Sequence, residues 1–365
     1  LSMLLGMLTL AVFVIGIISG RPTLEMFLTA VAIAVSAIPE GLPISMTVIL
    51  AIGVERMAKR KGVVRKLIAA ETLGSTTVIL TDKTGTLTMA KMALSRVLPL
   101  QSSKETLLTR ALINTTVLIE NPEESPEAWR MNGRIMETAL VRSAASLGMP
   151  LSQITDKTQV LQAMPFNSVQ KFSVSLIKDF DNHTVVVLGA PDTLIANSSL
   201  NSEKKEALLS QINELALSGE RVLGVAAKEI VHTEDFSLAK DFTRTNLVFE
   251  GFVTFKDPVR PGIKQAIDRV RGAGIKTIIM TGDHQGTALA IAKEIGIPVD
   301  EQSMLDAAEL VTLSDQSLRE RLPHVSVISR VTPFDKLRVA KLFQELGEVV
   351  AMTGDGTNDS PALKK

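Results

Sequence analysis

The sequence predicts a mixed α/β protein built on a doubly wound parallel sheet, with an apolar hairpin before the sheet and a second domain inserted into it. Three observations carry this prediction. Residues 1–54 contain only three charged side chains. Short β-branched runs that end in an aspartate motif alternate with helical segments farther along the chain. About 160 residues separate the first such run from the others, far more than an α/β connection needs.

The apolar hairpin follows from the first 54 residues. Residues 1–20 form a run long enough to cross a bilayer as a helix. The second run, residues 24–54, is interrupted by two prolines and a glycine within residues 38–43, which break the helical hydrogen-bond ladder. Free carbonyls beside the intramembrane carboxylate of Glu40 are typical of a hard-cation site. A kinked structural helix is the alternative interpretation of this break.

Basic residues gather directly after the second run. Six of them lie between residues 56 and 66, which places that end in the cytoplasm by the positive-inside rule. We therefore expect an integral membrane protein whose body, from about residue 55 to residue 365, is cytoplasmic. The hairpin and a stalk form the first predicted domain, residues 1–72.

The parallel sheet is predicted from four strand-like runs. The first, residues 76–81, is β-branched and ends at Asp82. Later runs at 275–280, 325–329 and 349–352 alternate with helical segments near 285–295 and 334–346. Ligands bind at the carboxyl edge of such sheets. That edge would gather Asp82, Thr281, Asp355 and Asp359.

A cluster of carboxylates at this edge suits phosphoryl transfer. One carboxylate can attack phosphorus and form an acyl phosphate. Two others can hold Mg²⁺, which neutralises the phosphate oxygens, and Lys336 at a helix start can supply a further positive charge. The sequence contains no G-x-x-x-x-G-K-[ST] motif, so the chain is not a P-loop enzyme.

The inserted segment has elements of its own. Helices are expected near 104–118, 137–147 and 202–217, and strands at 172–178, 184–189 and 221–228. We therefore predict one domain over residues 97–252, and another formed by residues 73–96 together with 253–365.

The overall composition excludes several classes of function. The 365 residues carry 39 basic and 39 acidic side chains, and this balance argues against a general nucleic-acid binder. The absence of cysteine excludes a disulfide scaffold, a thiolate zinc site, an iron–sulfur cluster and a cysteine nucleophile.

Three motifs resemble those of the P-type ATPases, cation pumps with a haloacid-dehalogenase-like (Rossmann-like) phosphorylation domain and an inserted α+β nucleotide-binding domain. They are Asp82-Lys83-Thr84-Gly85-Thr86-Leu87-Thr88, Thr281-Gly282-Asp283 and Thr353-Gly354-Asp355-Gly356-Thr357-Asn358-Asp359. The resemblance implies that Asp82 is the phosphorylated nucleophile. It also implies that the side chains of Asp82 and Asp355 and the carbonyl of Thr84 hold Mg²⁺. The remaining implied site residues, which contact the phosphoryl group or complete the site, are Lys83, Thr84, Thr281, Gly282, Asp283, Lys336, Asn358 and Asp359.

Thr84 distinguishes a pump from a phosphatase. Many haloacid-dehalogenase-like phosphatases carry an acid/base aspartate two residues after the nucleophile, where this chain has Thr84. Threonine cannot take a proton from water, so the acyl phosphate should persist, as a pump needs during a conformational change.

The resemblance also implies that ATP binds to the insertion. The matching nucleotide-site residues are Glu137, Phe166, Lys171, Gly189 and Arg221, with Asp257 and Arg260 in the hinge. Taken singly, Phe166 could be a core residue, and Lys171 and Arg221 could be surface charges. One position departs from the family, which commonly has lysine where this chain has Leu188. Lower nucleotide affinity or looser selectivity for ATP is the expected consequence.

The interrupted run bears on the transported ion. Pro39-Glu40-Gly41-Leu42-Pro43 is similar to the calcium pumps of the sarco/endoplasmic reticulum and secretory pathway. The resemblance implies ion ligands from Glu40 and from the carbonyls of Val35, Ser36 and Ile38. Ca²⁺ is favoured, and Mn²⁺ follows.

The resemblance also bears on what the chain can do alone. It implies a piece that runs from the third transmembrane helix through the phosphorylation domain. Such a piece would lack the actuator domain and the later transmembrane helices, and would not transport alone. Its expected partners are ATP, a divalent cation and the lipid bilayer. The alternatives are a pump for Mn²⁺ or a monovalent cation, a membrane-anchored haloacid-dehalogenase-like phosphatase, and a non-catalytic nucleotide-binding remnant.

Overall fold

The computed structural model describes residues 2–36, 41–149, 158–179, 182–230 and 236–355. Four predicted site residues, Ile38, Glu40, Asn358 and Asp359, lie outside these ranges. The chain divides into two compact units, Leu1–Ser75 and Thr76–Lys365, and each is described by itself.

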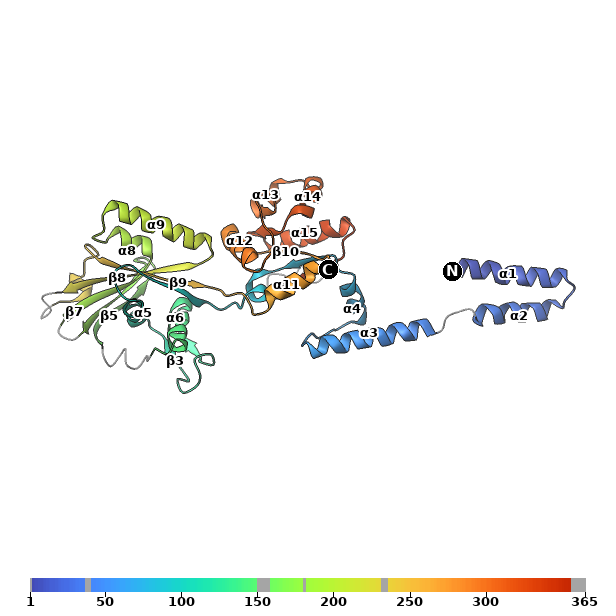
Figure 1. Ribbon diagram of the computed structural model, residues 1–365, viewed down its shortest axis with the longest axis horizontal. Helices are drawn as coiled ribbons and strands as arrows, with labels where there is room; N and C mark the ends of the chain where they lie inside the picture. Colours follow the sequence, from blue (N-terminus) through green and yellow to red (C-terminus); the bar gives the residue numbers. More distant parts are fainter. Residues whose placement is uncertain (1, 37–40, 150–157, 180–181, 231–235, 356–365) are drawn as a thin grey trace. The chain divides into compact units, whose positions relative to one another are not determined.

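The described residues of the first unit form four helices, α1 (Ser2–Ile18), α2 (Thr23–Ser36), α3 (Gly41–Lys59) and α4 (Leu67–Gly74). Helices α1 and α2 lie side by side (Figure 1), and Met26 of α2 is buried against Gly16 of α1. The predicted interruption falls where α2 ends at Ser36 and α3 begins at Gly41. Within the described residues, none of the helices combines the length and the apolar character that a membrane crossing requires.

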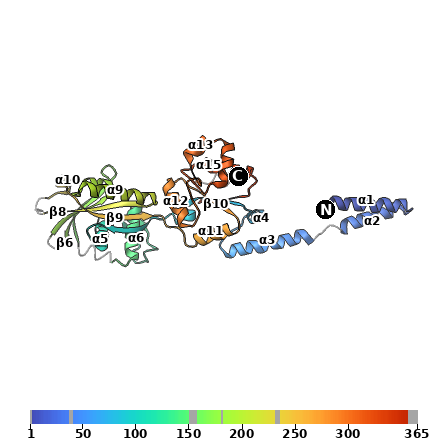
Figure 2. The ribbon, with the colours of Figure 1, turned by 45° about the horizontal axis from the view of Figure 1, so that its top comes forward.

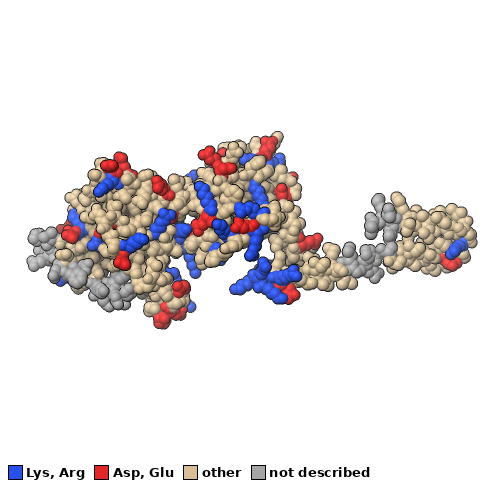
Figure 3. Space-filling view, viewed as in Figure 1, with Lys and Arg blue, Asp and Glu red and all other residues tan. Residues whose placement is uncertain are grey.

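Basic side chains gather at the carboxyl end of α3 (Figure 3). Arg56 and Lys59 lie in its last turn, and together with Arg60 they line a shallow surface hollow. This is the cluster that the positive-inside rule assigned to the cytoplasmic side.

The second unit contains the predicted parallel sheet. Its strands lie in the order β11-β12-β10-β1-β13, and every neighbouring pair is parallel. The prediction of an α/β fold with a parallel sheet is therefore confirmed. The strands span β1 Val78–Thr81, β10 Lys276–Met280, β11 Met304–Asp306, β12 Val327–Ser329 and β13 Val350–Thr353.

Helices cover both faces of this sheet (Figure 2) because successive strand residues point to opposite sides. Ile278 belongs to the core that includes Phe343 of α15, whereas the next residue, Ile279, packs in the core that includes Ile291 of α12. The helices are α11 Ile263–Gly272, α12 Gln285–Glu294, α13 Ala307–Thr312, α14 Asp315–Arg321 and α15 Pro333–Glu345, with a short 3₁₀ turn at Leu322–His324.

A six-stranded antiparallel sheet forms the rest of the second unit, in the order β2-β9-β8-β7-β6-β5. Its strands are β2 Ala93–Pro99, β5 Gln159–Asn167, β6 Phe172–Asp179, β7 Asn182–Gly189, β8 Arg221–Ile230 and β9 Val248–Lys256, and a separate pair joins β3 Leu118–Ile119 to β4 Met131–Asn132. Helices α5 (Lys104–Ile113) and α6 (Ile135–Ser146) share one apolar core with the sheet. Helices α8 (Pro191–Ala196), α9 (Ser202–Leu217) and α10 (Leu238–Asp241) belong to the second core.

Some expected element ends differ from the observed ones. The helix expected over 104–118 ends at Ile113, where Asn114 caps it and a polar Thr-Thr pair follows. The helix expected from residue 137 already begins at Ile135. The predicted domain boundaries stay a prediction.

Candidate functional site

Asp82 lies at the carboxyl end of β1 and contacts a buried lysine. Its Oδ1 atom is 2.5 Å from Nζ of Lys336. The Lys336 side chain is 3% exposed and that of Asp82 is 13% exposed. A capping box between Thr332 and Asp335 fixes the start of α15, and Lys336 lies in its first turn. The helix therefore presents one desolvated positive charge to the carboxylate.

The turn after Asp82 brings a second carboxylate close. Within the segment Lys83–Leu87, Thr84 has ψ 130° and Gly85 has φ 73°, a left-handed conformation that suits glycine. A Cβ atom on Gly85 would lie 3.3 Å from Cβ and 3.5 Å from Oδ2 of Asp355. This close approach follows from the sheet, because Thr353 on β13 is paired with Thr81 on β1.

The donors around this turn fit a magnesium ion. Carboxylate and carbonyl oxygens are its usual protein ligands, and it keeps several waters. The carboxylates of Asp82 and Asp355 and the carbonyl of Thr84 supply that chemistry. Across the described ranges, no group of three or more His, Cys, Asp or Glu side chains is arranged so that it could hold a metal ion.

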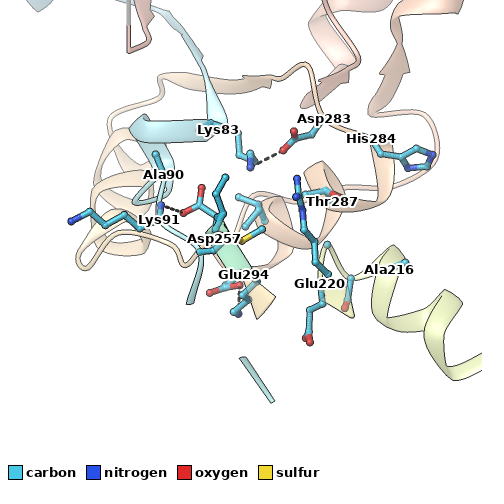
Figure 4. Close-up of a pocket in the computed structure, with 18 residues that line it drawn as sticks. Lys83, Ala90, Lys91, Ala216, Glu220, Asp257, Asp283, His284, Thr287 and Glu294 are labelled. Atoms are coloured by element: carbon cyan, nitrogen blue, oxygen red, sulfur yellow. Dashed lines mark hydrogen bonds and ion pairs between the residues drawn. The ribbon is translucent and has the colours of Figure 1, made fainter. Parts of the chain in front are cut away.

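The Thr-Gly-Asp motif follows β10 at the same edge of the sheet. Thr281 is buried, and its hydroxyl accepts a hydrogen bond from the backbone N–H of Asp283 over 3.1 Å. Asp283 pairs with Lys83 at 2.6 Å, and the Lys83 side chain is almost fully buried (Figure 4). Gly282 is exposed between them. The first two motifs are thus linked by an ion pair.

Asp257 and Arg260 brace the loop that follows Asp82. The Thr88 hydroxyl donates to Oδ2 of Asp257 over 2.6 Å. Arg260 donates from Nε to the Thr88 carbonyl over 3.0 Å and from Nη2 to the Gly85 carbonyl over 2.7 Å. These contacts tie the segment after β9 to the turn that carries Thr84.

A polar cavity of about 430 Å³ lies beside this loop (Figure 4). Lys83, Thr84, Asp257 and Asp283 line one part of it, and Arg221 from β8 lines another. The structure therefore brings Arg221 to the same cavity as the loop after the nucleophile candidate. Asp257 is both a brace and a lining residue.

A second cavity, of about 150 Å³, lies over the antiparallel sheet. Three predicted nucleotide-site residues line it together, Glu137, Phe166 and Gly189. The backbone of Gly189 packs so closely against Phe172 that any side chain there would collide with it. The buried side chain of Leu188, at the position of the family lysine, is a further part of the lining.

Lys171 is placed differently from those three residues. Its side chain is exposed, its φ is 62°, and its carbonyl accepts a hydrogen bond from the N–H of Ala190 over 2.9 Å. The cavity lining that the structure describes does not include Lys171. Its carbonyl contact ties the turn between β5 and β6 to Ala190, the N-cap residue of α8.

Val35 and Ser36 form the last two positions of α2, in the first unit. Both are exposed, and the Ser36 hydroxyl donates to the Ile33 carbonyl over 3.2 Å. The other two predicted ion ligands, Ile38 and Glu40, lie outside the described residues.

Arg134 is a cavity residue that the sequence reasoning missed. Its guanidinium carbon lies 4.1 Å from the centre of the Phe166 ring, and it forms an ion pair with Oε1 of Glu137. Burial lowers the pKa of Arg134 from its ordinary value. The i, i+3 spacing to Glu137 was the one local signal that could have identified it.

Comparison with known proteins gives a consistent result. The family model described as P-type ATPase, cytoplasmic domain N matches residues 102–262. Calcium-transporting ATPase 1 of Saccharomyces cerevisiae is 40% identical over 390 residues, covering 96% of this chain and 41% of the relative. Calcium-transporting ATPase 1 of Lactococcus lactis is 39% identical over 362 residues, covering 94% and 41%. Cation-transporting ATPase pma1 of Synechocystis is 35% identical over 410 residues, covering 100% and 44%.

The fold and these similarities define a mixed α/β protein that is similar to P-type ATPases over almost its whole length. More narrowly, residues 102–262 match the model of the cytoplasmic domain N of that family. The chain spans about two fifths of the length of the curated relatives that it matches.

Proposed function

We propose that the chain carries the phosphorylation and nucleotide-binding parts of an ATP-driven cation pump, and that the transported ion is Ca²⁺. The contact between Asp82 and Lys336, with Asp355 next to Gly85 of the following turn, carries the proposal, because it sets a carboxylate nucleophile and a positive charge at one sheet edge. The printed names of two relatives in this family favour Ca²⁺. Mn²⁺ follows as the alternative cargo.

The proposed reaction is attack by a carboxylate oxygen of Asp82 on the γ-phosphorus of ATP. An acyl phosphate forms while the bond from phosphorus to the β–γ bridging oxygen breaks, and ADP leaves. Lys336 balances the charge of the phosphoryl oxygens, and the Thr84 and Thr281 hydroxyls donate to them. Asn358 and Asp359 complete the site by family analogy. Mg²⁺ held by Asp82, the Thr84 carbonyl and Asp355 would neutralise phosphate charge.

Persistence of the acyl phosphate follows from Thr84. A hydroxyl at this position cannot remove a proton from an attacking water, so hydrolysis is slow. Lys83 and Asp283 hold each other at 2.6 Å and keep the loop beside the phosphoryl group in place. The Asp257 and Arg260 braces act on the same loop.

The proposed ATP site uses two cavities of the second unit. The adenine would stack on Phe166 beside Glu137 and Gly189 in the smaller cavity. Arg221 would meet the phosphates in the larger cavity, whose lining also includes Thr84. The exposed ammonium of Lys171 would contact the nucleotide from the rim of the smaller cavity.

The architecture proposed for this function has three domains. A haloacid-dehalogenase-like phosphorylation domain over 73–96 and 253–365 carries an inserted nucleotide-binding domain over 97–252. Residues 1–72 form a membrane hairpin and stalk, and residues from about 55 onward are cytoplasmic. Exposed apolar side chains along α1, α2 and α3 support the hairpin, among them Leu10, Leu24 and Ile49.

The proposed ion site lies at the break between α2 and α3. It would use the carbonyls of Val35, Ser36 and Ile38 and the carboxylate of Glu40. An actuator domain and further transmembrane helices would be partners of this segment in the complete pump.

The test is incubation of the chain with γ-labelled ATP and Mg²⁺, with and without Ca²⁺. We expect acid-stable, hydroxylamine-sensitive label that disappears in Asp82→Asn and persists in Asp192→Asn, a matched change at an exposed aspartate. Rapid phosphate release without trapped label would favour the phosphatase. The absence of both label and turnover would favour a non-catalytic remnant. Replacing Ca²⁺ by Mn²⁺ or Na⁺ in the complete pump tests the cargo.

A further inference from the structure

Arg134 occupies the smaller cavity of the second unit in a specific way. Its guanidinium lies 4.1 Å from the centre of the Phe166 ring and covers that face of the ring. The same guanidinium donates to Oε1 of Glu137. Arg134 is the N-cap residue of α6, so its backbone is fixed while its side chain, 41% exposed, can reach solvent.

Both oxygens of Glu137 already accept hydrogen bonds while Arg134 stays in place. Its side chain is 4% exposed. Its Oε2 atom accepts hydrogen bonds from the N–H and the hydroxyl of Thr116, at 3.3 and 3.4 Å. Its Oε1 atom is taken by Arg134. A ligand that approaches this carboxylate through the cavity therefore meets Arg134, because Arg134 lines the cavity together with Glu137 and Thr116 is not among the lining residues described.

The remaining lining of the cavity offers an incoming group little else. Leu188 and Leu223 are apolar, and the Ser173 hydroxyl already donates to the carbonyls of Asn114 and Leu188 at 3.3 Å each. Among the described lining residues, Arg134 is the only cation. It is also the most readily displaced polar group, because Glu137 and Ser173 are buried.

A planar guanidinium with N–H donors resembles an aminopurine in the two features that allow binding in this cavity. Both stack on an aromatic face, and both donate hydrogen bonds from an N–H group to a carboxylate. A ring-to-guanidinium separation of 4.1 Å leaves no space for a base between the two planes. Base and guanidinium must therefore exclude each other on that face of the Phe166 ring.

We propose that Arg134 is an intramolecular occupant of the base subsite, and that an adenine base binds by displacing it from both Phe166 and Glu137. This inference rests on the proposed nucleotide site and adds the residue that sets its affinity. The ordinary strengths of an exposed cation–π contact and a partly exposed ion pair imply that Arg134 weakens base binding about threefold to tenfold.

Calorimetric titration of the chain with adenosine tests the proposal, because adenosine carries no phosphate that would itself attract Arg134. Arg134→Ala is expected to tighten adenosine binding about threefold to tenfold. Arg130→Ala removes an exposed charge from the same segment and should leave the affinity unchanged. Equal or weaker adenosine binding by Arg134→Ala would overturn the proposal.

Two further measurements separate failure of the inference from failure of the nucleotide site. Phe166→Ala should weaken adenosine binding whether or not Arg134 competes with the base. Absence of adenosine binding in both the wild type and Arg134→Ala contradicts the site itself, and this inference with it.

In the wild type, the ring-current-shifted Nε–H signal of Arg134, assigned with Arg134→Lys, should move to a solvent-exposed value on saturation with adenosine. A signal that stays unmoved in the bound state overturns the displacement.

Discussion

Nζ of Lys336 lies 2.5 Å from Oδ1 of Asp82, although 254 residues separate them in the sequence. The strand β1, which ends directly before Asp82, is the fourth of five in its sheet, and α15 packs in the same apolar core as Leu80 of that strand. The pairing of charges is therefore a consequence of how the parallel sheet and its helix pack. It fixes the carboxylate that we propose as the nucleophile toward phosphorus.

Removing the lysine from this pair should cost stability as well as activity. Lys336→Gln removes this cation from the largely buried Asp82 carboxylate, and we expect the free energy of unfolding to fall by about 3 kcal/mol. Urea denaturation measures the change. Lys341→Gln on the same helix is the control, since its 3.9 Å pair with Glu345 is exposed. An equal loss of unfolding free energy in Lys336→Gln and Lys341→Gln would contradict a stabilising buried pair between Lys336 and Asp82.

The Arg260 brace should control the mobility of the loop after Asp82. Arg260→Ala removes hydrogen bonds to the carbonyls of Gly85 and Thr88. We expect amide hydrogen exchange in residues 83–91 to become about tenfold faster, because local opening loses charge-assisted bonds. Arg269→Ala on the exposed face of α11 should leave those rates unchanged. Unaltered exchange in Arg260→Ala would show that the loop is held by other contacts.

Gly85 is required by both conformation and space. Gly85→Ala places a Cβ at φ 73° and 3.3 Å from Asp355, and we expect it to destabilise the protein by about 1–2 kcal/mol. Phosphorylation at Asp82 should fall too, because the turn presents the Thr84 carbonyl. Gly272→Ala at the end of α11 meets no atom within 4 Å and should not destabilise. Thermal unfolding of both variants measures the change in stability. Similar losses of stability in Gly85→Ala and Gly272→Ala would contradict the explanation by strain at position 85.

The parts of the site that lie next to strand ends could be predicted from the sequence. Asp82, Thr281 and Asp355 follow short apolar strands, and parallel strands bring their carboxyl ends to one edge. The signal is local, so one sequence was sufficient. The edge strand β11 was missed because its three residues, Met304–Asp306, are too few for a periodic pattern.

The contacts that depend on tertiary packing could not be predicted. Asp257 meets Thr88 across 169 residues, and no local pattern distinguishes that brace from a nucleotide contact. Arg134 reaches Phe166 from a helix cap to a strand of the antiparallel sheet. Such a pair depends on the direction of two side chains across different elements, which periodicity does not encode.

Asp306 should make the parallel-sheet core sensitive to acid. The N–H of Ala308 donates to its carboxylate, the Ser329 hydroxyl donates as well, and Arg330 lies nearby, so the pKa of Asp306 is lowered. Because the folded pKa lies below the unfolded one, the stabilisation is complete above the unfolded value and is lost as pH falls through the folded value.

Asp306→Asn tests this titration because asparagine can still cap α13. We expect the gap in unfolding free energy between wild type and Asp306→Asn to be largest above about pH 5 and to narrow toward about pH 3. Asp306→Ala loses the cap itself, so part of its cost should remain at every pH. If the difference in unfolding free energy between wild type and Asp306→Asn stays constant with pH, the charge of the Asp306 carboxylate is not the source of the stabilisation.

Restoring the family lysine at position 188 should depend on whether Arg134 is present. Leu188 is 3% exposed, and Leu188→Lys alone would bring an ammonium group into a cavity whose carboxylate, Glu137, already pairs with Arg134. We expect that substitution to lower the free energy of unfolding by about 2–3 kcal/mol, whereas Leu188→Met, which is neutral and similar in volume, should cost less than about 1.5 kcal/mol.

In the Arg134→Ala background, Oε1 of Glu137 can accept from the new ammonium, so the cost of Leu188→Lys should fall by about 1 kcal/mol. A double-mutant cycle by urea denaturation measures this coupling. Additivity within about 0.3 kcal/mol would show that residues 134 and 188 do not compete for the same carboxylate.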